Sequence, residues 1–166
     1  MKLPANNKIS TNQKKNSNNW LYLLLIAIVY WIVYATFFDA KLDLNGDNAT
    51  YIQLARNIAN GYGYADVGIH GATPASHFPP AYSAFLSVFI WLGIDSLVFF
   101  KLLNGILLFA SYILLFFIVK KSTKNKILAF SSVAVAVFAP SIMRFATICM
   151  SEVLFGFCCI ACFFVW

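Results

Sequence analysis

Residues 20–38 read WLYLLLIAIVYWIVYATFF, a run of nineteen residues without a charge. At 1.5 Å per residue, an α-helix of this length reaches roughly 28 Å, about the thickness of the hydrocarbon core of a bilayer. A cleaved signal peptide would be shorter and would end at a small-x-small site, which does not precede Asp39. This stretch therefore predicts a transmembrane helix.

The composition of the whole chain agrees with a membrane protein. Of its 166 residues, 61% are hydrophobic and only 11% are charged, and the mean hydropathy is +0.75. The net charge of +6 does not indicate nucleic-acid binding, because the lysines gather in short clusters beside apolar runs. We therefore predict an all-α integral membrane protein built as a multi-span helical bundle.

Three further spans follow from hydropathy and from the lysines. Residues 96–119 are long enough to cross, and the basic stretch 120–126 after them belongs in the cytoplasm under the positive-inside rule. The chain then returns through 127–143, with Pro140 as an expected kink. A fourth span over 153–166 stops after roughly fourteen residues, too few to cross. We expect the chain to be the N-terminal part of a longer protein, truncated in that span.

The remaining segments are assigned from the same topology. Residues 1–19 are polar and basic and are predicted to form a disordered cytoplasmic tail. Residues 39–95 form the external loop. Within it, 80–94 covers only about 22 Å as a helix, so we expect it to lie at the interface. Lys101 then lies near the outer end of its span, where its stem is expected to snorkel to water.

The external loop contains a second predicted helix, over residues 48–60. Tyr51, Leu54, Ala55 and Ile58 recur at helical spacing and form one face that could lie on the membrane surface. Asp47 stands where this helix begins. It is either an N-cap whose carboxylate accepts backbone N–H bonds, or a general base at the interface, and both roles can coexist.

Two stretches resemble one family of membrane enzymes. GDNATYIQLARNIANGYGY (46–64), followed by HFPPAYSAFLSVFIWLG (77–93), is similar to the first external loop of GT-C glycosyltransferases, in particular the protein-mannosyltransferase and aminoarabinose-transferase branch (glycosyltransferase family 39 type). MRFATICMSEVLFGF (143–157) resembles the second external connection of that family. Two features depart from the pattern: Asn48 stands where an acidic residue usually follows the catalytic Asp, and PPAYSAF (79–85) replaces the commoner Pro-Pro-Gly-Tyr-Pro.

The resemblance implies an inverting transfer of a sugar from a polyprenyl-phosphate-linked donor to a hydroxyl or phosphate acceptor of a protein, lipid or glycan. Asp47 matches the catalytic base and Glu152 the second external acidic position. The residues expected to contact substrate are Asn48, Tyr51, Arg56, His77 and Arg144. A divalent metal ion is left open, because Asn48 offers only a neutral carbonyl ligand.

Two other classes of function compete with this interpretation. The chain could be a non-catalytic fragment or subunit that binds polyprenyl lipids, or a transporter. Transporters usually carry ionisable or helix-breaking residues at mid-span, whereas the polar residues of this chain collect in the external loops. The location expected from the whole pattern is multi-pass in a bacterial inner membrane, with the N-terminus in the cytoplasm and the loop bearing Asp47 outside.

Overall fold

The computed structural model describes residues 19–42, 47–68 and 71–166; the predicted tail, apart from Asn19, lies outside the described residues. The elements are α1 (Asn19–Phe37), α2 (Asn48–Ala59), β1 (Ala65–Gly68), β2 (Gly71–Pro74), α3 (Pro80–Trp91), α4 (Leu97–Thr123), α5 (Lys126–Val137), α6 (Pro140–Thr147) and α7 (Ser151–Val165).

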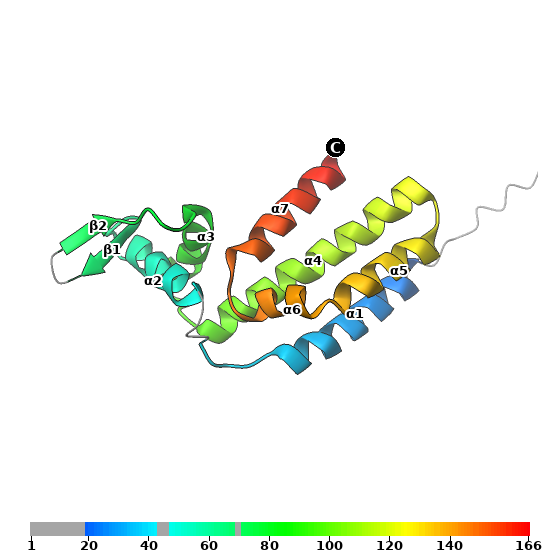
Figure 1. The fold of residues 1–166 in the computed structure, drawn as a ribbon, viewed down its shortest axis with the longest axis horizontal. Helices are drawn as coiled ribbons and strands as arrows, with labels where there is room; N and C mark the ends of the chain where they lie inside the picture. The colour runs from blue at the N-terminus through cyan, green and yellow to red at the C-terminus, as the bar shows by residue number, and fades with distance from the viewer. Residues whose placement is uncertain (1–18, 43–46, 69–70) are drawn as a thin grey trace, which may run out of the picture.

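Helices dominate the molecule, as predicted, and form two parts (Figure 1). α1, α4, α5 and α7 run along a bundle, while α2, α3 and the hairpin sit at one of its ends. α1 and α4 are each long and apolar enough to cross a membrane. α7 is apolar but has only 15 residues. The chain is therefore a helical membrane protein by the length and composition of these helices.

The predicted third span, 127–143, consists of two helices. α5 ends at Val137, and α6 starts at Pro140 with its axis bent by 64° from that of α5. Proline has no N–H, so it cannot complete the helical bond to the carbonyl of Ala136. That carbonyl accepts from the Tyr112 hydroxyl of α4 at 3.0 Å and from the N–H of Ala139 at 3.2 Å instead. The kink predicted at Pro140 is confirmed, and α6 continues past the predicted end of the span at 143 as far as Thr147.

α1 and α4 are joined by hydrogen bonds from two buried tyrosines. The hydroxyl of Tyr30 donates to the carbonyl of Gly105 at 2.6 Å, and that of Tyr34 donates to the carbonyl of Lys101 at 2.7 Å. The close approach depends on the missing side chain at Gly105, because a Cβ there would lie 2.7 Å from Cζ of Tyr34. These bonds fix the register of the two longest helices.

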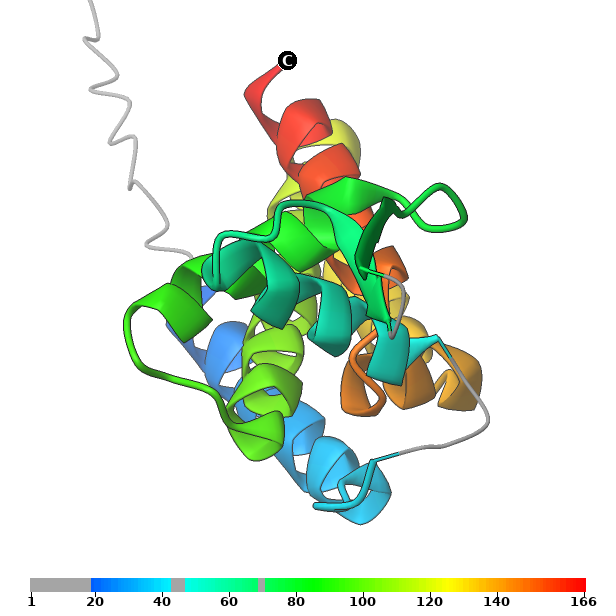
Figure 2. The same cartoon turned by 90° about the vertical axis from the view of Figure 1, so that its left-hand side faces the viewer.

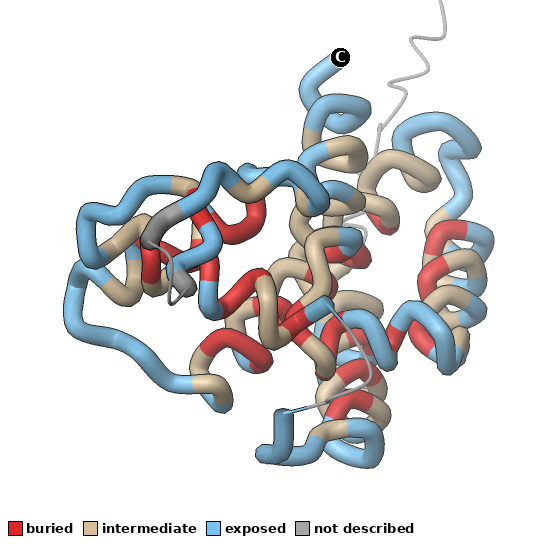
Figure 3. Tube along the Cα trace, turned by 60° about the vertical axis from the view of Figure 1, so that its left-hand side comes forward, coloured by how far each residue is buried: buried red, intermediate tan, exposed pale blue. Residues whose placement is uncertain are grey.

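The end of the bundle carries a small second core (Figure 2). α2 packs against α3, and the buried face of α2 contains three of its four predicted apolar positions, Tyr51, Leu54 and Ala55. α2 stops where expected, since Gly61 has a φ of +83°, a left-handed conformation that favours glycine. Figure 3 shows the buried positions of both parts in red.

The two-stranded hairpin was not predicted and modifies the all-α assignment. β1 and β2 pair antiparallel, with Ala65 opposite Pro74 and Asp66 opposite Thr73. The hairpin is tied to α2, because the Asn57 amide donates to the carbonyl of Ala65 at 2.7 Å. It lies at the far end of the molecule from the lysine-rich turn between α4 and α5 (Figure 1).

Gly105→Ala is expected to destabilise the protein by about 1–3 kcal/mol, because the new methyl group overpacks the contact with Tyr34. Thermal unfolding in detergent measures the change. Gly156→Ala is the matched control, since a Cβ at this helical position meets nothing within 4 Å. An equal loss of stability in both variants would contradict the proposed packing.

Candidate functional site

Charges are divided between the two ends of the bundle. Lys120, at the end of α4, donates from Nζ to Oδ1 of Asn19 at 2.9 Å, so the start of α1 and the lysine-rich turn lie at the same end. The other end is formed by α2, which Asp47 precedes, by the end of α1, which Asp39 follows, and by the start of α7, which contains Glu152 (Figure 1). The polar residues predicted to form a site therefore gather at the end opposite the lysine-rich turn between α4 and α5.

Asp47 occupies the N-cap position of α2 but does not cap the helix. Its carboxylate makes no bond to the N–H groups of the first turn, so the predicted capping role is wrong. The backbone explains this: Asp47 has φ −75° and ψ −5°, whereas a capping residue needs the extended conformation to turn its side chain back. The carboxylate is exposed at the surface instead.

Asn48 is completely buried and its amide is unsatisfied. Neither its Nδ2 nor its Oδ1 has a hydrogen-bond partner within the described part of the chain. A buried polar group without a partner costs about 1–3 kcal/mol. Such a group is rare in a packed core, and here it lies directly beside Asp47 in the chain.

Tyr51 links the two stretches that carry the predicted site. Its hydroxyl lies 3.1 Å from that of Ser151, a residue 100 positions further along the chain. Ser151 in turn donates to Oε2 of Glu152 at 3.4 Å. The first turn of α2, which follows Asp47, therefore contacts the first turn of α7, which carries Glu152.

Glu152 lies between two apolar hollows on either side of α7. One hollow, of about 310 Å³, is lined by residues of α4, α5, α6 and α7; the other, also about 310 Å³, lies between α3 and α7 and includes Tyr82 and Ser151. Apolar hollows beside a carboxylate suit a molecule that has a long hydrocarbon chain and a polar end.

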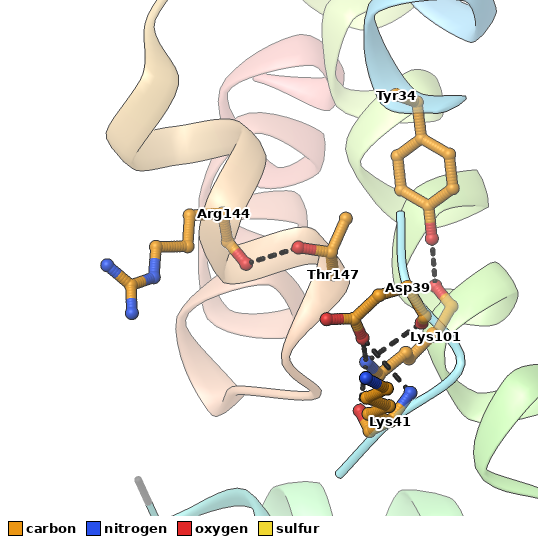
Figure 4. Close-up of polar contacts among 6 residues, drawn as sticks. All are labelled: Tyr34, Asp39, Lys41, Lys101, Arg144 and Thr147. Atoms are coloured by element: carbon orange, nitrogen blue, oxygen red, sulfur yellow. Dashed lines mark hydrogen bonds and ion pairs between the residues drawn. The ribbon is translucent and has the colours of Figure 1, made fainter. Parts of the chain in front are cut away.

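The three other predicted contact residues are placed differently. Arg56 forms a bidentate ion pair with Asp95, at 2.8 and 2.9 Å, which ties the end of α2 to the chain before α4. Arg144 is on the exposed face of α6, and Figure 4 shows its side chain pointing away from Lys101. His77 is exposed in the loop before α3. The structure does not bring Arg56 or His77 into contact with Asp47 or Glu152 among the described residues.

Lys101 does not snorkel to water as predicted. Its side chain is only 1% exposed, and its Nζ donates to the carboxylate of Asp39 at 2.7 Å, to the carbonyl of Asp39 at 3.0 Å and to that of Lys41 at 2.6 Å (Figure 4). The hydrogen bond from Lys101 holds the pKa of Asp39 below its ordinary value. All three protons of the ammonium group therefore have acceptors inside the protein.

Sequence reasoning missed Asn104, a buried amide one turn after Lys101. Asn104 accepts a hydrogen bond from the Tyr82 hydroxyl at 3.1 Å and donates to the carbonyl of Met150 at 3.4 Å. A signal was present, because a lysine and an asparagine at i and i+3 interrupt an otherwise apolar run.

The described residues do not assemble an obvious metal centre. No group of three or more His, Cys, Asp or Glu side chains gathers within ranges 19–42, 47–68 and 71–166. Asn48 also supplies an amide where paired carboxylates would bind a hard cation better.

Comparisons with known proteins do not assign this chain to a family. The sequence and fold match no protein family, no curated protein and no solved structure at a significant level. The resemblance to GT-C glycosyltransferases stays a prediction. The fold and the site define a helical membrane protein with a polar site at one end of its bundle.

The ion pair of Asp39 predicts how stability responds to acid. Because the pKa of Asp39 is lowered in the folded state, the pair stabilises the protein above the ordinary value of 3.8 and is lost as the pH falls through the lower folded value. Asp39→Asn should therefore cost stability at pH 7 and much less at about pH 3. Denaturant titrations at both pH values measure this, with Asp66→Asn on the exposed hairpin as control. An equal cost of Asp39→Asn at both pH values would contradict the ion pair.

Proposed function

We propose that this protein is a membrane glycosyltransferase that moves a sugar from a polyprenyl-phosphate-linked donor to a hydroxyl or phosphate acceptor on the external face. The observation that carries the proposal is the contact between Tyr51 and Ser151, because it joins the two stretches that resemble GT-C enzymes. Tyr51 and Ser151 are 100 residues apart in the chain, Asp47 comes four residues before Tyr51, and Glu152 directly follows Ser151.

In the proposed mechanism, Asp47 acts as the general base. Its exposed carboxylate takes the proton of the acceptor hydroxyl as the acceptor oxygen attacks the anomeric carbon of the sugar. The bond from that carbon to the phosphate oxygen breaks, and the lipid phosphate leaves with the electron pair, which inverts the anomeric centre. A phosphate leaves as an anion, so it needs positive charge and hydrogen bonds rather than a general acid.

Residues near Asp47 and Glu152 would bind the leaving phosphate, the sugar and the acceptor. Arg144 on α6 and Arg56 on α2 are the two candidates for the leaving phosphate, because a guanidinium can donate two parallel hydrogen bonds to phosphate oxygens. The buried amide of Asn48 can bind a sugar or acceptor hydroxyl, which would satisfy both of its atoms. Glu152 lies at the junction with α7, where it can orient the sugar through hydrogen bonds.

The two apolar hollows beside α7 would fit the hydrocarbon chain of the proposed donor lipid. Each is lined almost entirely by apolar side chains and reaches Glu152, so a polyprenyl chain lying along α7 would present its phosphate near the site. The same hollows favour a second candidate function, a subunit that binds polyprenyl lipids without catalysis. A sugar-transfer assay distinguishes the glycosyltransferase from the binding subunit, because a binding subunit retains the lipid but transfers no sugar.

Asp47→Asn is expected to lower the rate of transfer by about 10²- to 10⁴-fold, the usual contribution of a general base. Its unfolding temperature should not change, because Asp47 makes no capping bond to α2. Membranes containing the full-length protein, supplied with a panel of lipid-linked sugars, provide the assay.

The matched control is Asp66→Asn, an exposed aspartate on the hairpin of the same loop, which should transfer sugar at the normal rate. A normal rate of sugar transfer by the Asp47→Asn variant would refute the assignment of Asp47 as the general base. Lipid retention without transfer by the unaltered protein would instead support the binding subunit.

A further inference from the structure

The turn between α4 and α5 concentrates positive charge at one end of the bundle. Residues 120–126 read KKSTKNK and contain four lysines: Lys120, Lys121, Lys124 and Lys126. The sequence has no acidic residue before Asp39 and none between Asp95 and Glu152. The three helices that meet at this end, α1, α4 and α5, therefore supply no carboxylate to balance the lysines.

Hydrogen bonds within the turn hold its backbone in one shape. The N–H of Lys124 donates to the carbonyl of Lys120 at 3.0 Å. The N–H of Asn125 donates to the Thr123 hydroxyl at 3.2 Å, and the Asn125 side chain caps α5 by accepting from the N–H of Ile127 at 2.9 Å. The lysine side chains therefore extend from a fixed frame.

Two of the four lysines are held against the first turns of α1. Lys120 donates from Nζ to Oδ1 of Asn19 at 2.9 Å, and the ammonium of Lys126 lies 5.4 Å from the ring centre of Tyr22, within the range of a cation–π contact. The other two are exposed at the surface: Lys121 and Lys124. The positive charge thus covers the ends of all three helices rather than one short loop.

Lys124 has a backbone conformation that favours glycine. Its φ of 54° and ψ of 16° are left-handed, and the residue that ends a helix in this conformation is usually glycine, which has no Cβ to clash. A glycine here would relieve the backbone. What the lysine adds at this position is its exposed ammonium group, so the strain points to a role for that charge.

Exposed apolar side chains lie directly beside the lysines. Ile127 follows Lys126 and is 63% exposed, and Trp20 follows Asn19 and is 64% exposed. Lysine beside tryptophan and aliphatic side chains is typical of a membrane surface, where ammonium groups meet phosphates and apolar groups meet acyl chains. A soluble polyanion, such as RNA or an acidic peptide, would leave Ile127 and Trp20 in water.

We propose that the turn over residues 120–126 binds the phosphate groups of anionic phospholipids, with Lys121 and Lys124 as contacts and with Ile127 and Trp20 against the acyl chains. α1 and α4, whose ends form this surface, are each long and apolar enough to cross a membrane, so the turn would lie among lipid headgroups. The surface is at the opposite end of the bundle from the start of α7 (Figure 1). The inference is therefore independent of the proposed transfer of sugar.

The test uses the purified full-length protein in a neutral detergent, titrated with phosphatidylglycerol or with phosphatidylcholine. Native mass spectrometry counts the lipids that stay bound. Phosphatidylglycerol should bind about tenfold more tightly than phosphatidylcholine at low salt, and high salt should remove most of this difference. A large excess of inorganic phosphate should not displace it, because free phosphate has no acyl chain to cover Ile127 and Trp20.

The double variant Lys121→Gln with Lys124→Gln should bind phosphatidylglycerol about tenfold or more weakly, since each lysine near an anionic surface contributes about fivefold. Its affinity for phosphatidylcholine should stay within about twofold. Lys41→Gln is the matched control, because Lys41 is an exposed lysine that follows α1 at the other end of the bundle. This control should bind both lipids like the unaltered protein.

Lys124→Gly separates lipid binding from folding. The variant should unfold at the same temperature as the unaltered protein or higher, because glycine adopts a φ of 54° without a clash. It should nevertheless bind phosphatidylglycerol about fivefold more weakly. Normal binding by this variant would overturn the role of Lys124.

Four other results would overturn the proposal as a whole. They are equal affinity for the two lipids, normal phosphatidylglycerol binding by the double variant, an equal loss of binding in Lys41→Gln, and displacement of the lipid by inorganic phosphate, an RNA oligonucleotide or an acidic peptide. The last result would identify a site for soluble anions instead of a lipid surface.

Discussion

The buried ammonium of Lys101 is the constraint on which this structure depends. A charge inside an apolar bundle is tolerated only when every proton has an acceptor, and those acceptors come from the chain that leaves α1. The hydrogen bonds that satisfy the Lys101 ammonium therefore determine where the chain that follows α1 starts. Tyr30 and Tyr34 add two bonds from α1 to the same turn of α4, so the helix pair and the loop are fixed together.

The outer part of the molecule is built on this anchored pair. α2 and α3 share their own small core, and the Arg56–Asp95 pair closes the end of α2 against the chain before α4. Tyr51 then joins α2 to α7 through Ser151. The resulting junction combines an exposed carboxylate at Asp47 with an unsatisfied buried amide at Asn48, two features that folding alone does not require.

Much of the helical architecture could be predicted from sequence, because hydropathy and proline act locally. The first two spans, the break at Pro140 and helices near 48–60 and 80–94 all appear. The partners of Lys101 could not be predicted, since they lie 60 and 62 residues away in the chain. The cap at Asp47 failed because the backbone there is already helical, and the hairpin lacks the alternating apolar pattern that marks a strand. The roles of Asp47 and Glu152 rest on resemblance and stay a prediction.

The break between α5 and α6 has a consequence for how a ligand would arrive. Ala136, Ile142 and Phe145, from either side of the break, line the hollow beside α7, and the Tyr112 hydroxyl donates to the carbonyl of Ala136 at the break. A straight α5 would continue along the bundle, whereas the axis bends by 64°, and residues of α6 line the hollow together with α4, α5 and α7. The wall of the hollow is therefore apolar on every one of these helices, so a long hydrocarbon chain could enter it without exchanging its apolar surroundings for water.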